Sequence, residues 1–375
     1  MKKATRQHTK AHNARLVLKL IYDQGEISRA DIARATCLTR PTVSSIVDEL
    51  IENGFVIETG RGPSAGGKRP TLLSVAHDAH QLLCIDLGSH EFRGAVANLR
   101  GEIQAQVAFP LDQQTETAAL ALVYDLVDRL AAVADRPILG IGVGTPGLVD
   151  PVAGVIRRAV NLNWNDLPLR DLLAARYDLP VYVANDSHMA ALAEYTFGPL
   201  RDSKNLIVIK IGRGVGAGIV LHGQPFYGDG MGAGEIGHVV VEEDGRGCTC
   251  GNAGCLETVA GTAALMAQAG MRWEALVDAY DAGDPAVATL VQRAARYLGR
   301  AIANLVGSLN IHHVVLAGRV NQFGLQFLAW IQAEMARRVM PSMAADTQLT
   351  YATHGAEIVM LGCSAMILNQ ELGII

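Results

Sequence analysis

The sequence predicts an α/β protein preceded by a small helical domain, and three observations support this. From residue 82 onward, apolar segments typical of strands alternate with helical segments, and several strands end in glycine-rich turns. The first 78 residues instead contain three short helical segments followed by two strands. The chain has 375 residues, which is too long for one compact core and indicates two or three domains.

Composition and charge narrow the class of protein. Half of the residues are hydrophobic, yet no apolar run is long enough to span a bilayer. The basic start of the chain is followed by no apolar segment, so we expect no signal peptide, no membrane insertion and a cytoplasmic location. Residues 1–78 hold 12 Lys/Arg and 8 Asp/Glu, whereas the rest holds 20 and 29. This difference favours an anionic partner for the first segment alone.

The N-terminal elements follow one another in the order of a winged helix-turn-helix. Apolar residues within 13–23 have helical spacing. Ser28 is the predicted N-cap of a second helix, and Thr39 is the predicted N-cap of a third. Segments 55–58 and 71–75 then have the pattern of two strands. This order predicts a winged helix-turn-helix over residues 1–78.

Such a domain predicts binding to double-stranded DNA, with the start of the third helix in the major groove. The loop at 60–70 contains Arg61, Lys68 and Arg69, which could contact phosphates or a narrow minor groove. The alternative is a three-helix module that binds a protein, but such a module does not need three cations in a loop. The predicted DNA-contacting residues are Ser28, Arg29, Thr39, Arg40, Thr42, Ser44, Ser45, Lys68 and Arg69.

The body of the chain is read as alternating strands and helices. The predicted strands lie at 82–88, 93–99, 138–147, 181–186, 206–211 and 314–318. The predicted helices lie at 115–134, 187–195 and 355–370. Open α/β sheets bind ligands at the carboxyl ends of their strands, so the polar residues that follow these strands are candidate site residues.

Two features at these strand ends have alternative interpretations. Asp186 can accept a proton from a substrate hydroxyl, but it can also be the N-cap of the helix that follows. The glycine-rich segment 212–218 can bind a phosphate through backbone N–H groups. Alternating glycines are equally typical of a tight hairpin.

A metal site is predicted by His238, Cys248, Cys250 and Cys255, which lie within eighteen positions and are interspersed with glycines. One histidine and three cysteines supply the four ligands of a structural zinc ion and leave no coordination position for water. The alternatives are disulfides or unligated thiols. Glu235 and Glu257 bracket the cluster. The remaining cysteines, Cys37, Cys84 and Cys363, are expected to pack as small hydrophobic side chains.

Taken together, these motifs resemble the ROK family (repressors, open reading frames, sugar kinases) over nearly the whole chain. The resemblance rests on Asp86-x-Gly88, Gly144-Thr145-Pro146-Gly147, Asn161-Leu162 with Trp164, Asn185-Asp186, Glu235-x-Gly237-His238 and the Cys-x-Cys-Gly-x-x-Gly-Cys-x-Glu run at 248–257. It implies a two-lobed actin-like/hexokinase-like, ribonuclease H-like fold behind the winged helix. The implied domains are 1–78, a smaller lobe of 79–185 plus 357–375, and a larger lobe of 186–356 with the zinc site and an oligomerisation surface.

The resemblance also implies roles for individual residues. Asp186 would be the catalytic base in a member that phosphorylates, and His238 would use one ring nitrogen for zinc and the other for a sugar or carbonyl oxygen. Segment 66–70 resembles the family's linker between wing and body, which contacts DNA. The residues implied to bind sugar are Gly147, Asn161, Asn185, Asp186, Glu235, His238 and Glu257.

The loops that face the nucleotide in family kinases are altered here. Ser89-His90 follows Gly88 where a threonine is common, Arg213 replaces the threonine of Gly-Thr-Gly, and the adenosine turn reads 317–319 Ala-Gly-Arg instead of paired glycines. Arg213 would either fill the nucleotide position or attract phosphate. We therefore expect zinc as the cofactor and no use of ATP or Mg²⁺.

The leading hypothesis is a sugar-responsive transcriptional repressor. It would bind operator DNA as a homodimer or a dimer of dimers and respond to a monosaccharide or sugar phosphate. The first alternative is a bifunctional ATP-dependent sugar kinase, of the glucokinase or N-acetylhexosamine kinase type, that also binds DNA. The second is a repressor controlled by a protein partner.

Overall fold

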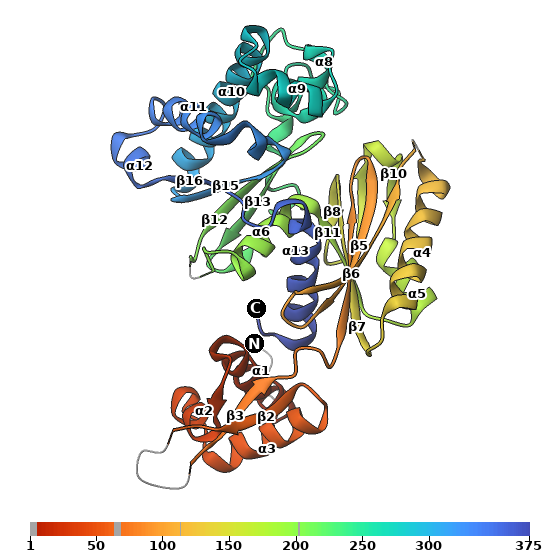
Figure 1. Cartoon of the computed structure of the whole chain (residues 1–375), viewed down its shortest axis with the longest axis vertical. Coiled ribbons are helices and arrows are strands. Elements are labelled where there is room, and N and C mark those ends of the chain that lie inside the picture. Colours follow the sequence, from red (N-terminus) through yellow and green to blue (C-terminus); the bar gives the residue numbers. More distant parts are fainter. Residues whose placement is uncertain (1–5, 64–68, 113, 202) are drawn as a thin grey trace.

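Three units follow one another along the chain, each built on a sheet (Figure 1). The computed structural model of the protein describes residues 6–63, 69–112, 114–201 and 203–375. The first unit has a three-stranded sheet, and each of the other two is organised around a five-stranded sheet. Within the described ranges, no helix has both the length and the apolar character needed to cross a bilayer.

The first unit is a winged helix-turn-helix, as predicted. Ser28 accepts a hydrogen bond from the Asp31 N–H, and Thr39 accepts one from the Thr42 N–H, so both predicted N-caps are confirmed. The first helix begins at Arg6, seven residues before the predicted segment. The elements are α1 (Arg6–Gln24), β1 (Ile27–Ser28), α2 (Arg29–Thr36), α3 (Arg40–Glu52), β2 (Val56–Arg61) and β3 (Thr71–Val75).

One prediction for this unit was wrong. Cys37 is exposed, and its left-handed backbone (φ 56°) ends α2, so it does not pack in a core. Of the implied linker segment 66–70, residues 66–68 lie outside the described residues, and Arg69 and Pro70 directly precede β3, which pairs with β2. The Gly62 N–H donates to the Pro70 carbonyl at 2.8 Å. The chain passes to the body through residues 76–80.

The second unit is a five-stranded sheet with helices on both faces. Its strand order is β11-β7-β4-β5-β6, in which β4, β5 and β6 are antiparallel, whereas β4, β7 and β11 are parallel. A small antiparallel sheet, β10-β9-β8, follows β7. The elements are β4 (Gln81–Leu87), β5 (Glu91–Asn98), β6 (Ile103–Pro110), α4 (Glu116–Val133), β7 (Ile138–Thr145), β8 (Leu148–Asp150), β9 (Val155–Ala159), η1 (Val160–Leu162), β10 (Trp164–Leu167), α5 (Leu169–Tyr177) and β11 (Val181–Asn185).

The third unit repeats this topology. Its strand order is β14-β13-β12-β15-β16, again with an antiparallel trio followed by two parallel strands. Two copies of this sheet make the two-lobed, ribonuclease H-like architecture that was predicted. The elements are α6 (Asp186–Phe197), β12 (Leu206–Ile211), β13 (Val215–Leu221), β14 (Gln224–Pro225), η2 (Ile236–His238), α7 (Glu257–Ala260), α8 (Thr262–Ala269), α9 (Trp273–Asp281), α10 (Pro285–Leu309), β15 (His313–Gly318), η3 (Arg319–Phe323), α11 (Gly324–Ala336), α12 (Pro341–Asp346), β16 (Gln348–Tyr351), η4 (Gly355–Glu357), α13 (Ile358–Ile367) and η5 (Leu368–Leu372).

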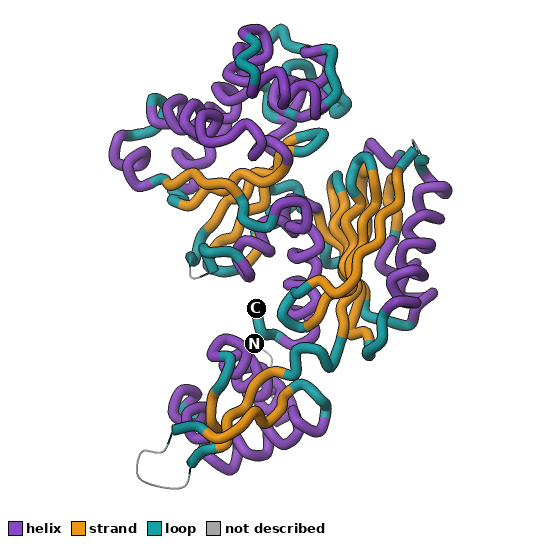
Figure 2. The backbone as a smooth tube through the Cα atoms, viewed as in Figure 1, coloured by secondary structure: helices purple, strands orange, loops and turns teal. Residues whose placement is uncertain are grey.

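Helices α6 and α13 lie between the two five-stranded sheets, and the other large helices cover the outer faces (Figures 1 and 2). Glycines allow this close packing. A Cβ atom at Gly144 of β7 would collide with Val359 of α13, and one at Gly362 of α13 would collide with the Met189 carbonyl of α6. As a result, α6, α13 and the sheet of the second unit share one core.

The C-terminal segment connects the body to the winged helix. Ile374 is 1 % exposed and belongs to the same apolar core as residues of α1. Its carbonyl accepts a hydrogen bond from Lys19 Nζ at 3.0 Å. Arg100 forms a second contact, donating to the Tyr22 carbonyl at 3.0 Å while its guanidinium lies 4.4 Å from the Tyr22 ring centroid. The C-terminal segment therefore lies beside α1 (Figure 1).

Candidate functional site

A cleft of about 610 Å³ opens where the carboxyl ends of β7 and β11 face the β12–β13 hairpin. The structure brings together in this cleft all seven residues that the family resemblance implied for sugar binding. They come from both lobes and from the small β10-β9-β8 region. The lining includes Gly147, Asn161, Asn185, Asp186, Glu235, His238 and Glu257.

Asn185, and not Asp186, is the N-cap of α6. Its side-chain oxygen accepts from the Ser187 N–H at 2.8 Å and from the His188 N–H at 3.4 Å. Its amide nitrogen donates to the Gly147 carbonyl at 2.9 Å. The capping interpretation of Asp186 was therefore wrong, because Asn185 performs that role and fixes the loop after β7. The Asp186 carboxylate is left to face the cleft.

Asp186 is paired with a lysine. Lys210 Nζ lies 2.7 Å from Asp186 Oδ2, and the two side chains are only 22 % and 13 % exposed. A second carboxylate, Asp86 at the end of β4, accepts from Arg93 Nη2 at 2.5 Å. Burial disfavours the charge on Lys210, but Asp186 and Asp86 outweigh burial and raise the pKa of its ammonium. Burial raises the pKa of the Asp86 carboxyl, although Lys210 and Arg93 oppose that shift.

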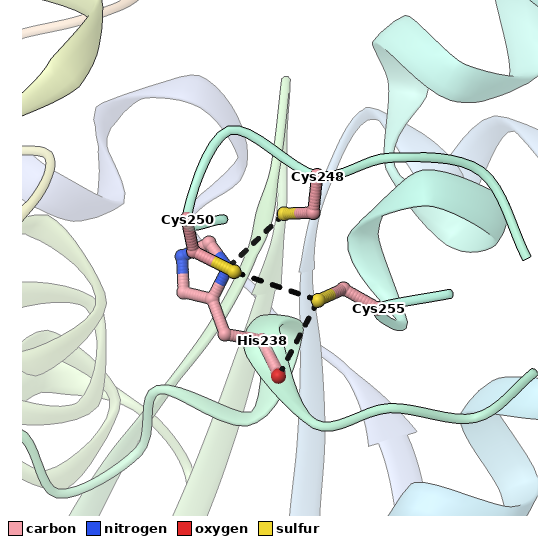
Figure 3. Close-up of side chains that lie close together, drawn as sticks. All are labelled: His238, Cys248, Cys250 and Cys255. Carbon is pink, nitrogen blue, oxygen red and sulfur yellow. Dashed lines mark hydrogen bonds between the residues drawn. The ribbon is translucent and has the colours of Figure 1, made fainter. Parts of the chain in front are cut away.

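The four predicted metal ligands converge at one corner of the cleft (Figure 3). Their ligand atoms all lie within 4.8 Å of one another. Cys250 Sγ is 3.6 Å from Cys255 Sγ, and Cys248 Sγ is 3.5 Å from His238 Nδ1. Ligands about 2.3 Å from a tetrahedral zinc ion are separated by roughly these distances. All the cysteines are free, so the disulfide alternative is excluded and the donor set fits zinc.

The local backbone explains how so short a segment can converge on one point. Gly251 and Gly254 both have positive φ, 104° and 72°. A Cβ at Gly254 would also collide with the Glu242 carbonyl. The loop can therefore turn back and place its cysteines opposite His238.

Glu235 and Glu257 lie beside this corner, as predicted. Glu235 Oε2 is 3.8 Å from His238 Nε2, and Glu257 Oε1 is 3.6 Å from His238 Nδ1. The Cys248 thiol donates to Glu257 Oε1 at 3.0 Å. Burial raises the pKa of Glu235, and the nearby charges of Asp186 and Glu257 add to that effect. The carboxylates of Glu235 and Glu257 therefore both line the cleft next to the metal ligands.

The two loops at 212–214 and 317–319, which face the nucleotide in family kinases, each make contacts within this chain. Gly212 and Gly214 form a tight turn in which the Gly212 N–H donates to the Gly214 carbonyl at 3.0 Å, and Arg213 projects from it exposed. The residues that follow form strand β13, so segment 212–218 is part of a hairpin, as one of the two interpretations predicted. Arg319 pairs with Glu274 at 2.6 Å and lies 5.5 Å from the Trp273 ring centroid.

The predicted DNA-contacting residues divide into two groups. Arg40, Ser45 and Arg69 are exposed, and Thr42 and Ser44 are half-buried on the first turns of α3. Thr39 is exposed but serves as the N-cap of α3. Lys68 lies outside the described residues.

Two of these residues have structural partners within the domain. Ser28 is 2 % exposed and caps α2, so it positions that helix. Arg29 pairs with Asp48 and Glu58, at 2.9 Å each, and so joins α2 to α3 and β2.

Sequence reasoning did not identify three cations that line the cleft, Arg158, Lys210 and Arg246. For Lys210 a signal was present. Leu206 and Val208 are fully buried, and a lysine at the next alternate position of the same strand interrupts that apolar face. No comparable pattern marks the two arginines.

Comparison with known proteins places the chain among regulators and kinases. Residues 82–370 match the model of the ROK family, and residues 12–59 match that of the MarR family. A putative xylose repressor of Caldicellulosiruptor sp. is 34 % identical, with 96 % of both chains covered.

Solved structures agree with this placement. A ROK family transcriptional regulator described as a homologue of the Escherichia coli Mlc protein superposes with a TM-score of 0.85 at 29 % identity, covering 98 % of both chains. A Streptomyces griseus ROK glucokinase superposes with a TM-score of 0.70 at 24 % identity, covering 76 % of this chain and 98 % of the kinase, which shows the fold alone. This chain therefore belongs to the ROK family and carries a MarR-like winged helix-turn-helix domain at its N-terminal end.

Proposed function

We propose that the protein is a sugar-responsive transcriptional repressor of carbohydrate genes. The observation that carries the proposal is the presence, in one chain, of a winged helix with an exposed recognition helix and a cleft lined by all seven sugar-binding candidates. The full-length similarity to a putative xylose repressor supports it. The effector is a monosaccharide or a sugar phosphate, and the protein acts in the cytoplasm.

The proposed domains are the winged helix (1–78), a smaller lobe (79–185 plus 357–375) and a larger lobe (186–356). Asp186 begins α6 at the border between the lobes, and α6 packs on α13, which runs on to the segment that contacts α1. A sugar that draws the lobes together would favour one arrangement of α6 relative to α13. It would change operator affinity only if it binds the two arrangements unequally.

On the DNA side, α3 enters the major groove with Arg40, Thr42, Ser44 and Ser45 toward bases or phosphates, and Arg69 of the wing contacts the backbone. Operators for such domains have two half-sites, which suits a homodimer or a dimer of dimers with the larger lobe as the oligomerisation surface.

A structural zinc ion held by His238, Cys248, Cys250 and Cys255 belongs to the proposal. When bound, it fixes the loop between η2 and α7 without offering a position to water. Glu235 and Glu257 would then be held at set positions, where their oxygens can accept hydrogen bonds from sugar hydroxyls, together with Asn161 and Asp186.

A sugar kinase is the second candidate, favoured by Asp186 in the cleft and by the fold shared with the glucokinase. As a kinase, the protein would use Asp186 as the base that accepts the sugar hydroxyl proton. The ion pair with Lys210 and the exposed Arg213 in the glycine turn argue against it. ATP and Mg²⁺ are therefore not part of the proposed function.

Operator binding, followed by fluorescence anisotropy during titration with a panel of monosaccharides and sugar phosphates, tests the proposal. We expect at least one member of the panel to change operator affinity about fivefold or more. Affinity that no member of a broad panel changes would count against a sugar effector and favour control by a protein partner. Steady ADP release with any aldohexose, abolished by Asp186→Asn, would favour the kinase.

A further inference from the structure

Lys210 interrupts the apolar face of β12. Leu206 and Val208 occupy the preceding alternate positions, are fully buried, and share a core with α6. A third apolar side chain would continue this pattern. The strand instead directs an ammonium group into the cleft, where a charge removed from water is strongly unfavourable unless it has partners.

Two carboxylates act on Lys210. Its Nζ lies 2.7 Å from Oδ2 of Asp186, the first residue of α6. The charge of Asp86, near the end of β4, also acts on Lys210. The Asp86 side chain is only 4 % exposed and is bound by Arg93 at 2.5 Å, and Arg93 also lies 3.6 Å from Glu91. The positive charge beside Asp186 is therefore already supplied by Lys210.

Two carboxylates at the carboxyl ends of parallel strands are the kind of ligand set that, with substrate phosphates, holds Mg²⁺ in phosphoryl-transfer sites. Here the ammonium group of Lys210, on β12, lies beside Asp186 instead. We propose that Lys210 is a built-in replacement for a divalent cation. It fixes the Asp186 carboxylate in place as a hydrogen-bond acceptor for a sugar hydroxyl, and it excludes Mg²⁺ and nucleotide from the cleft.

This inference deepens the proposed function, on which it rests, because it identifies the group that makes effector binding independent of metal ions. Asp186 paired with an ammonium still has lone pairs that can accept hydrogen bonds from sugar hydroxyls. Lys210 is thus a positioning residue that acts through Asp186. The ion pair also joins two elements, because Lys210 lies on β12 and Asp186 begins α6.

Manganese binding tests the inference without requiring the effector to be known. Free Mn²⁺ is measured by electron paramagnetic resonance in titrations of the full-length, zinc-loaded protein. The wild type and Asp186→Asn should give the same isotherm, because Asp186 holds no metal. Lys210→Ala should bind one additional Mn²⁺ per chain, and the double variant Lys210→Ala/Asp186→Asn should lose it. Lys210→Arg keeps the charge and should behave as the wild type.

Thermal unfolding separates folding from binding. Mn²⁺ should raise the Tm of Lys210→Ala and leave that of Lys210→Arg unchanged, because a ligand that binds only the folded state stabilises it. Lys210→Gln, which keeps side-chain length, replaces Lys210→Ala if the latter fails to fold. A wild type that loses Mn²⁺ on Asp186→Asn, or folded Ala and Gln variants that gain none, would overturn the inference. Operator titrations with sugars on the same samples test the proposed function separately.

Discussion

Truncation of one side chain in the C-terminal segment should uncouple the winged helix from the body. Ile374 is 1 % exposed and packs in the core that includes α1. Ile374→Ala removes three carbon atoms from that contact, which at ~0.8 kcal/mol per buried carbon amounts to about 2.4 kcal/mol. A change of that size lowers the equilibrium constant for docking by about 50-fold.

Calorimetry and operator binding together report this docking. In the wild type we expect the winged helix and the second unit to unfold in one transition, because they share a core. In Ile374→Ala the winged-helix transition should separate and move to lower temperature. The change in operator affinity caused by the effector should shrink, while sugar binding stays near that of the wild type.

Leu325→Ala is the matched control, because this side chain is 79 % exposed on the third unit. It should change neither the transition nor the sugar response. If Ile374→Ala keeps a single transition and the full sugar response, the C-terminal segment does not couple the two parts, and the reasoning from its burial is refuted.

Three further predictions concern the metal, the DNA contact and acid stability. Cys250→Ala should lose the one zinc ion per chain and loosen the cleft wall, whereas Cys37→Ala should keep the zinc ion. Elemental analysis that finds equal zinc in the two variants would contradict this prediction. Arg69→Ala should weaken operator binding and reduce its log–log salt slope by about 1, and identical affinities at every salt concentration would refute the contact. Glu334 is 3 % exposed and hydrogen-bonded to three arginines, which lower its pKa to about 2 despite the opposing effect of burial. Its stabilising contribution, about 2 kcal/mol after allowing for the exposure of the arginines, is present above pH ~4.3 and is lost as the pH falls toward 2. Glu334→Gln should therefore be less stable than the wild type in urea unfolding at pH 7 but nearly equal at about pH 2 and below. A stability difference that does not change with pH would contradict a contribution from the ionised Glu334 carboxylate.

Local patterns predicted the elements whose signals are local. The caps at Ser28 and Thr39 depend on side chains three residues from the N–H groups they bind, so the sequence itself specifies them. The strand 206–211 was predicted with its observed bounds, because five of its six residues are apolar. The metal cluster was equally visible, since histidine and three cysteines are close in the chain as well as in space.

Features that depend on tertiary contacts were missed. Nothing local distinguishes Asn185 from Asp186 as the cap of α6, because the choice is made by the Gly147 carbonyl that binds the Asn185 amide. Likewise, the role of Lys210 needs a partner 24 residues away on another element.

The most direct test of sugar control is the affinity of the sugar itself, measured by isothermal titration with and without saturating operator DNA. Linkage requires the two affinities to differ by the same factor by which the sugar changes operator affinity. We predict a ratio of about fivefold or more, in the direction set by the operator titration. Equal sugar affinity for the free and operator-bound protein would contradict the account.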